Sequence, residues 1–84
     1  MSDDLAEARR HHRMTLYRVI GFYGQEGVGF WEVQQVTGFG SDYLADLLGD
    51  MEKVGLLRRR EWLALVNGSI VKGEHYVAEG LPRE

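Results

Sequence analysis

Residues 33–55, VQQVTGFGSDYLADLLGDMEKVG, decide the fold. Over residues 41–54 the apolar side chains recur at the i, i+3, i+4, i+7 spacing of a helix that faces a core. They are Leu44, Leu47, Leu48, Met51 and Val54. Residues 31–36 predict a preceding helix, and residues 37–40 predict a turn in which Phe39 is directed inward. Gly55 stands where a glycine ends a helix. The stretch therefore predicts two helices joined by a tight turn.

The opposite face of the 41–54 helix carries Asp42, Asp46 and Asp50. A helix that contacts DNA usually presents Arg, Lys, Ser or Gln at such positions, because phosphates and most base edges are recognised by hydrogen-bond donors. One aspartate can accept a hydrogen bond from cytosine, but three in a row, one turn apart, are typical of a solvated or protein-binding face.

The chain has 84 residues, which we interpret as one domain over residues 1–84. Its hydrophobic fraction of 44% and charged fraction of 27% are ordinary for a globular protein. The net charge of −3 means that any affinity for a polyanion must come from local basic patches. The absence of cysteine, of a secretory signal and of an apolar run near the ~20 residues that span a bilayer predicts a cytoplasmic protein without a membrane segment.

The segments on either side extend this pattern. A long amphipathic helix is predicted from about Asp3 to Tyr23, with residues 1–15 as an N-terminal helical extension, and a one-rung strand is predicted at residues 28–30. After residue 55 the residue pattern changes from that of a helix to that of an extended strand, and Asn67-Gly68 predicts a type I′ hairpin turn. That turn places Val66 opposite Ser69, Ala64 opposite Val71, Trp62 opposite Gly73 and Arg60 opposite His75. A looser loop between residues 62 and 73 is the competing interpretation, and residues 81–84 are expected to form a frayed tail.

This order of elements resembles the winged helix-turn-helix domain over roughly residues 16–80. Val33 and Val36 match the core positions of the second helix, and Gly38-Phe39 match the turn. Residues 51–57, MEKVGLL, are similar to the "LExxGLL" end of the recognition helix in bacterial and archaeal regulators, including PadR-like and MarR-like groups, without assigning a subfamily. The expected class is mainly α with a small β-hairpin (α+β): three helices plus a two- or three-stranded antiparallel wing.

The resemblance implies a transcriptional regulator that binds double-stranded DNA as a dimer, with the third helix in the major groove and the wing beside it along the backbone or the minor groove. In this DNA-binding interpretation the phosphate contacts come from Ser41, Tyr43, Arg58, Arg59, Arg60 and Lys72. The homodimer would form through the N-terminal helix, the wing, or both. For the three arginines, solvated charges on an exposed strand are an equally weighted interpretation, with Arg58 and Arg60 on one face and Arg59 on the other.

The alternative is a winged-helix module that binds protein, with little or no DNA binding. Its contacts would be Asp42, Asp46, Asp50, Leu65 and Ile70. Because an apolar hairpin exposed to water is a liability, we expect one of its faces to be covered by the first helix or by a second copy of the chain.

Catalysis is the least supported class. The sequence has no glycine-rich phosphate loop, no cysteine nucleophile and no His-Glu metal motif. His11 and His12 are adjacent, so on a helix they point about 100° apart and cannot chelate as an i, i+4 pair does. We therefore expect no enzyme activity, no metal site and no cofactor.

Overall fold

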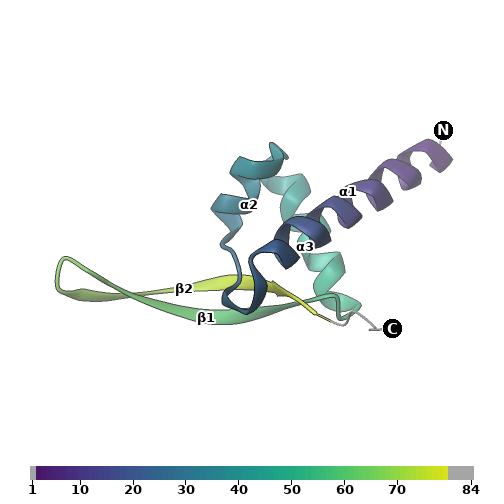
Figure 1. Ribbon diagram of the computed structural model, residues 1–84. Coiled ribbons are helices and arrows are strands. Elements are labelled where there is room, and N and C mark those ends of the chain that lie inside the picture. The colour runs from purple at the N-terminus through teal and green to yellow at the C-terminus, as the bar shows by residue number, and fades with distance from the viewer. Residues whose placement is uncertain (1, 80–84) are drawn as a thin grey trace.

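The computed structural model describes residues 2–79 as three α-helices followed by an antiparallel hairpin, which is the α+β class predicted (Figure 1). The elements in chain order are α1 Ser2–Phe22, the short 3-10 helix η1 Gly24–Glu26, α2 Phe30–Thr37, α3 Ser41–Lys53, β1 Leu57–Val66 and β2 Ser69–Ala78. The frayed tail predicted for residues 81–84 lies outside the described residues.

The core is formed by one side of each helix together with the base of the hairpin. Its buried residues are Leu16, Ile20, Val28, Val33, Leu44, Leu47, Leu48, Met51, Leu57 and Val77. Four of the five apolar residues predicted to line the core side of α3 are therefore buried. The fifth, Val54, is 71% exposed, because it caps α3 after the last helical residue and the chain turns away there. The prediction for Val36 is also wrong: it is 58% exposed, and the short α2 buries only Val33.

The turn between α2 and α3 follows the sequence prediction. Gly38 has a φ of 77° and caps α2, with its N–H donating to the Gln34 carbonyl. A left-handed residue of this kind is readily supplied by glycine. The next residue, Phe39, packs inward against the core. The Gln34 side chain then bridges the two helices, because its Nε2 donates to the Phe39 carbonyl and to Ser41 Oγ.

The hairpin has the register that the Asn67-Gly68 turn predicts. Val66 pairs with Ser69, Trp62 with Gly73, and the ladder continues to Leu57 and Ala78. The two turn residues both have positive φ, 51° and 82°, as a type I′ turn requires. The looser loop is therefore wrong. A single rung of a third strand is also present, since Val28 and Tyr76 exchange two backbone hydrogen bonds of 3.0 and 2.8 Å.

The hairpin extends beyond the helical body at its turn end (Figure 1). In Figure 1 its turn lies far beyond α2, and no helix runs alongside that end. Leu65 is 73% and Ile70 70% exposed. The first helix does not cover this surface as one interpretation of the sequence expected. Instead α1 reaches the opposite end of the hairpin, where the Tyr17 hydroxyl donates to the Glu79 carbonyl just after β2.

Candidate functional site

The residues predicted to contact DNA do not form one patch. Ser41 and Tyr43 lie at the start of α3, whereas Arg58 to Arg60 follow its end. A helix of 13 residues is about 20 Å long, which separates the two groups. Lys72 lies farther out on the hairpin, opposite Leu63.

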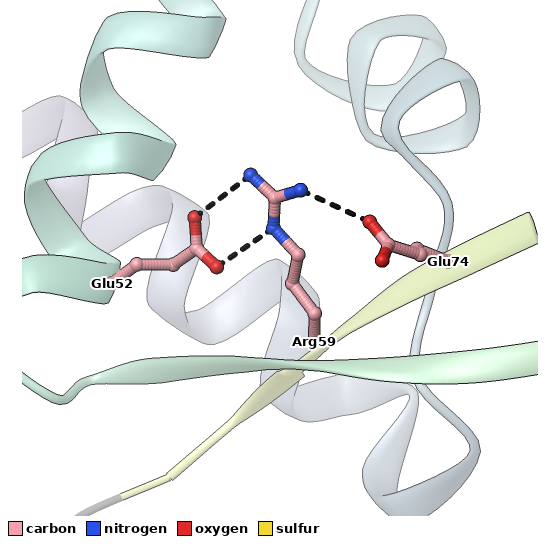
Figure 2. Close-up of polar contacts among 3 residues, drawn as sticks. All are labelled: Glu52, Arg59 and Glu74. Carbon is pink, nitrogen blue, oxygen red and sulfur yellow. Dashed lines mark hydrogen bonds and ion pairs between the residues drawn. The ribbon is translucent and has the colours of Figure 1, made fainter.

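Arg59 is held between two carboxylates. Its Nε and Nη2 donate to the two oxygens of Glu52 on α3 at 2.8 and 3.1 Å, and its Nη1 donates to Glu74 on β2 at 3.0 Å (Figure 2). The guanidinium also lies over the Tyr76 ring, 5.6 Å from its centroid. The hydrogen bonds to Glu52, and next the one to Glu74, raise the pKa of Arg59 above its ordinary value. One cation between two anions leaves a net negative charge at this point of the surface.

Arg58 and Arg60 lie on the other face of β1, as strand alternation predicted. Arg58 is paired with the Glu79 carboxylate and also donates to Gln25 Oε1 at 3.1 Å. Arg60 makes a long contact of 3.5 Å with the Glu26 carbonyl. Lys72 is 3.9 Å from Glu61. Exposed ion pairs of this kind contribute little to stability, yet they reduce the positive charge that strand residues offer to a polyanion.

Ser41 and Tyr43 are engaged in contacts between helices. Ser41 Oγ accepts the hydrogen bond from Gln34, and the Tyr43 hydroxyl shares a hydrogen bond of 2.6 Å with His12 Nδ1 on α1. The His12 ring lies 4.8 Å from the Phe39 ring. Sequence reasoning missed this cluster. The available signal was the position of His12 on the apolar side of the first helix, facing whatever packs there.

The acidic face of α3 is exposed at all three aspartates. Asp50 accepts a hydrogen bond of 3.1 Å from Arg9 on α1. Asp42 and Asp46 make no ion pair within residues 2–79. Two carboxylates near the start of α3 therefore face solvent without a counter-charge from the described residues.

Residues 62–73, which we name the distal hairpin, carry apolar side chains on both faces. By the register, Leu63, Leu65 and Ile70 share one face, and the other face has Trp62, Ala64, Val66 and Val71. Lys72 is the one charged residue in this segment. Trp62 stacks on His75 with ring centroids 5.2 Å apart, and most of the remaining side chains are exposed.

Other features of the described residues offer little for chemistry. An open apolar hollow of about 410 Å³ lies beside the end of α1, lined by Arg18, Val19, Phe22, Tyr23 and Val36. Within residues 2–79 no group of three or more His, Cys, Asp or Glu side chains is placed to hold a metal ion. None of the helices in the described part of the chain is both long enough and apolar enough to cross a membrane.

The arrangement thus presents two surfaces: an acidic helix face and an apolar, uncovered strand pair. The arginines between them are largely occupied by acids of the same chain. Comparison with known proteins adds no relative, since no protein-family model, no curated protein and no solved structure matches the sequence.

Proposed function

We propose that the protein is a cytoplasmic winged-helix interaction module, which binds protein through the acidic face of α3 and through the distal hairpin. The order of helices and hairpin and the packed side of α3 support the winged-helix assignment. One observation carries the proposed function: the distal hairpin is apolar on both faces and lies beyond the helical body.

An uncovered distal hairpin is costly for a monomer. A two-stranded hairpin by itself is marginally stable in water, and contiguous exposed apolar surface marks sites of protein association. Leu65 and Ile70 pair directly across the ladder and are both about 70% exposed. A partner that covers them gains hydrophobic contact and stabilises the ladder at the same time.

The acidic face selects the charge of the partner. Asp42 and Asp46 lie exposed on successive turns of α3, so they attract a basic surface and repel a nucleic acid. Arg59 does not reverse this effect, because Glu52 and Glu74 already neutralise it. A protein surface with Lys or Arg at matching spacing fits this face.

Duplex DNA binding as a dimeric transcriptional regulator is the second candidate function. The observation that favours it is the cationic side of α1, where Arg13 and Arg18 have no carboxylate partner among the described residues. Arg60, which has no carboxylate partner within residues 2–79, supplies a further phosphate contact.

Fluorescence anisotropy with a labelled random duplex separates the two functions. If the protein is an interaction module, the labelled duplex should stay unbound even at about 50 mM salt, a concentration at which phosphate contacts are strong. A DNA-binding protein instead shows affinity that falls with salt, and replacing Arg58, Arg59 and Arg60 with Ala flattens that slope. Salt-dependent duplex binding by the unmodified chain overturns the proposed function.

A second measurement tests the protein contact directly. Asp42→Asn and Asp46→Asn remove the two unpaired charges while keeping side-chain size. We expect this double variant to fold like the unmodified chain, by circular dichroism, and to lose a basic protein partner recovered by affinity capture. Glu7→Gln, which alters an acid on α1, is the matched control and retains the partner.

A further inference from the structure

The outer edge of β1 in the distal hairpin is unprotected. Residues 62–66, WLALV, form five consecutive uncharged apolar positions in an edge strand. Natural edge strands are usually interrupted by charged residues, proline, a bulge or a covering element, because free N–H and C=O groups recruit other strands. Within residues 62–66 this edge has neither a charge nor a proline. Segments of this composition pair readily with another strand.

Bonded and non-bonded cross-strand pairs alternate along the hairpin, and this alternation determines which residues of β1 have free backbone groups at its outer edge. Val66 and Ser69 flank a two-residue turn, so they and every second pair along the ladder bond to each other. The residues between them, Leu63 and Leu65 on β1, direct their backbone groups outward. The contact with Val28 confirms this alternation. Tyr76 is one of the residues whose backbone groups are directed away from the partner strand, and it exchanges both hydrogen bonds with Val28.

The two edges of the hairpin differ. The outer edge of β2 is occupied at Tyr76 by Val28, and its distal part carries Lys72, Gly73 and Glu74, which discourage further pairing. The outer edge of β1 has no such residues between Trp62 and Val66. An additional strand would therefore pair with the outer edge of β1 and not with that of β2.

We infer that the occupant of this edge is β1 of a second copy of the chain, paired antiparallel about a twofold axis at Ala64. This register sets Leu63 against Leu65 of the second copy and Trp62 against its Val66. Two bonded pairs form where the outward backbone groups of residues 63 and 65 meet. The result is a four-stranded sheet in the order β2-β1-β1-β2.

Self-pairing suits this edge because no like charges meet. In this register Glu61 lies opposite Asn67 of the second copy, and Arg60 lies opposite its Gly68, so neither charge faces its own kind. Leu63, Leu65 and Ile70 of both copies then form one continuous apolar strip on the same side of the sheet. A twofold contact also closes on itself, so it removes the unprotected edge without leading to open-ended assembly.

This inference rests on the proposed function, since it names the partner of the distal hairpin and leaves the acidic α3 face for a different protein. The interface is small, so we expect dissociation on the order of micromolar. Sedimentation equilibrium of the full chain should show a monomer–dimer equilibrium. Leu65→Lys should shift it to monomer, whereas Val36→Lys, at an exposed apolar site on α2, should leave it unchanged.

A cysteine pair gives the sharper test because the chain contains no cysteine. At the twofold axis the two copies of residue 64 form a non-bonded pair with Cα atoms about 4.5 Å apart, which suits a disulfide. Ala64→Cys should therefore form a covalent dimer on mild oxidation. Val71→Cys is the matched control: residue 71 faces Ala64 across the hairpin, but its two copies would lie about 14 Å apart, three strand spacings.

The outcomes separate the inference from the function on which it rests. An unmodified chain that stays monomeric at about 100 times the expected dissociation constant overturns the inferred dimer, and so does equal cross-linking at positions 64 and 71. If the chain is monomeric and the Asp42→Asn, Asp46→Asn variant still loses a protein partner, only the dimer is overturned. If the dimer forms and the unmodified chain binds duplex DNA in a salt-dependent way, the dimer stands and the wider interaction function fails.

Discussion

Gly73 lies directly opposite Trp62 in the hairpin, and the indole fills the space that a side chain at residue 73 would need. A Cβ atom at Gly73 would lie 2.9 Å from Cε3 of Trp62. The absence of that atom lets the indole lie flat across the strand and stack on His75. An aromatic residue that covers a cross-strand glycine in this way shields its backbone from water.

Gly73→Ala is expected to displace Trp62 from this position. Ala is a better strand residue than Gly, but the lost stacking, worth about 1 kcal/mol, offsets that gain. The emission of Trp62, measured with Trp31→Phe as background, should shift to longer wavelength. Gly49→Ala is the control, because a Cβ at that position would meet no atom within 4 Å apart from its chain neighbours and the backbone of its own helix. In the α3 interior it should stabilise the chain by about 0.5–1 kcal/mol.

Removing the charge of Arg59 is expected to weaken the contact between α3 and the hairpin. Arg59→Ala should lower the free energy of unfolding by about 1 kcal/mol, because it deletes two exposed ion pairs and the cover over Tyr76. Urea denaturation measures the loss. Arg60→Ala, whose side chain makes one long contact with a carbonyl, should change stability by less than about 0.5 kcal/mol. Equal effects of the two substitutions would argue against the Arg59 network.

His11 and His12 are expected to differ sharply although they are neighbours. His12→Ala removes the hydrogen bond to Tyr43 and the contact with Phe39, which together should cost about 1–2 kcal/mol. His11 is exposed, so His11→Ala should have little effect. Thermal unfolding of the two variants gives the comparison. Tyr43→Phe should reproduce the part of the loss that comes from the hydrogen bond.

The stability of the fold should decline at alkaline pH through Tyr76. Burial raises the pKa of the Tyr76 phenol above its ordinary value of 10.0, and the charge of Arg59 partly opposes this. The folded chain therefore keeps the phenol proton to higher pH than the unfolded chain does. The stability linked to this group is complete below pH 10.0 and is lost as pH rises through the folded-state pKa.

Absorbance titration of the four tyrosines measures this shift. The phenol of Tyr76 should ionise above pH 10.0, and Tyr76→Phe should remove that step from the titration. Arg59→Ala should delay it further, because Glu52 and Glu74 then act on the phenol without a compensating cation. An earlier ionisation in Arg59→Ala would contradict the assigned cause.

The parts of the fold that could be predicted are those fixed by short-range rules. The helical period placed Leu44, Leu47, Leu48 and Met51 in the core, and the Asn67-Gly68 turn fixed the register of all ten strand pairs. Val54 was misassigned because the period says nothing about where the chain leaves the body. The core stripe continues in the sequence for one residue after the helix has ended.

The candidate site was harder to predict because its contacts join distant segments. Glu74 is diagonal to Arg59 in the predicted register, so that contact could have been inferred from sequence. Glu52 could not, because its contact depends on the angle at which α3 meets β1. The same holds for His12 and Tyr43, which are 31 residues apart. Arg59 therefore looked available to a phosphate until α3 was placed beside β1.

The distance of the hairpin turn from the helices has a consequence for local stability. Backbone amides between residues 62 and 73 have no core above them, so they can open and exchange with deuterium while the helices remain folded. The rate of amide exchange in this segment is then independent of the rate of global unfolding. A molecule that binds the two strands would slow this exchange while leaving the melting temperature of the helical body almost unchanged. The exchange rate of residues 62–73 therefore reports whether a partner is bound to the hairpin.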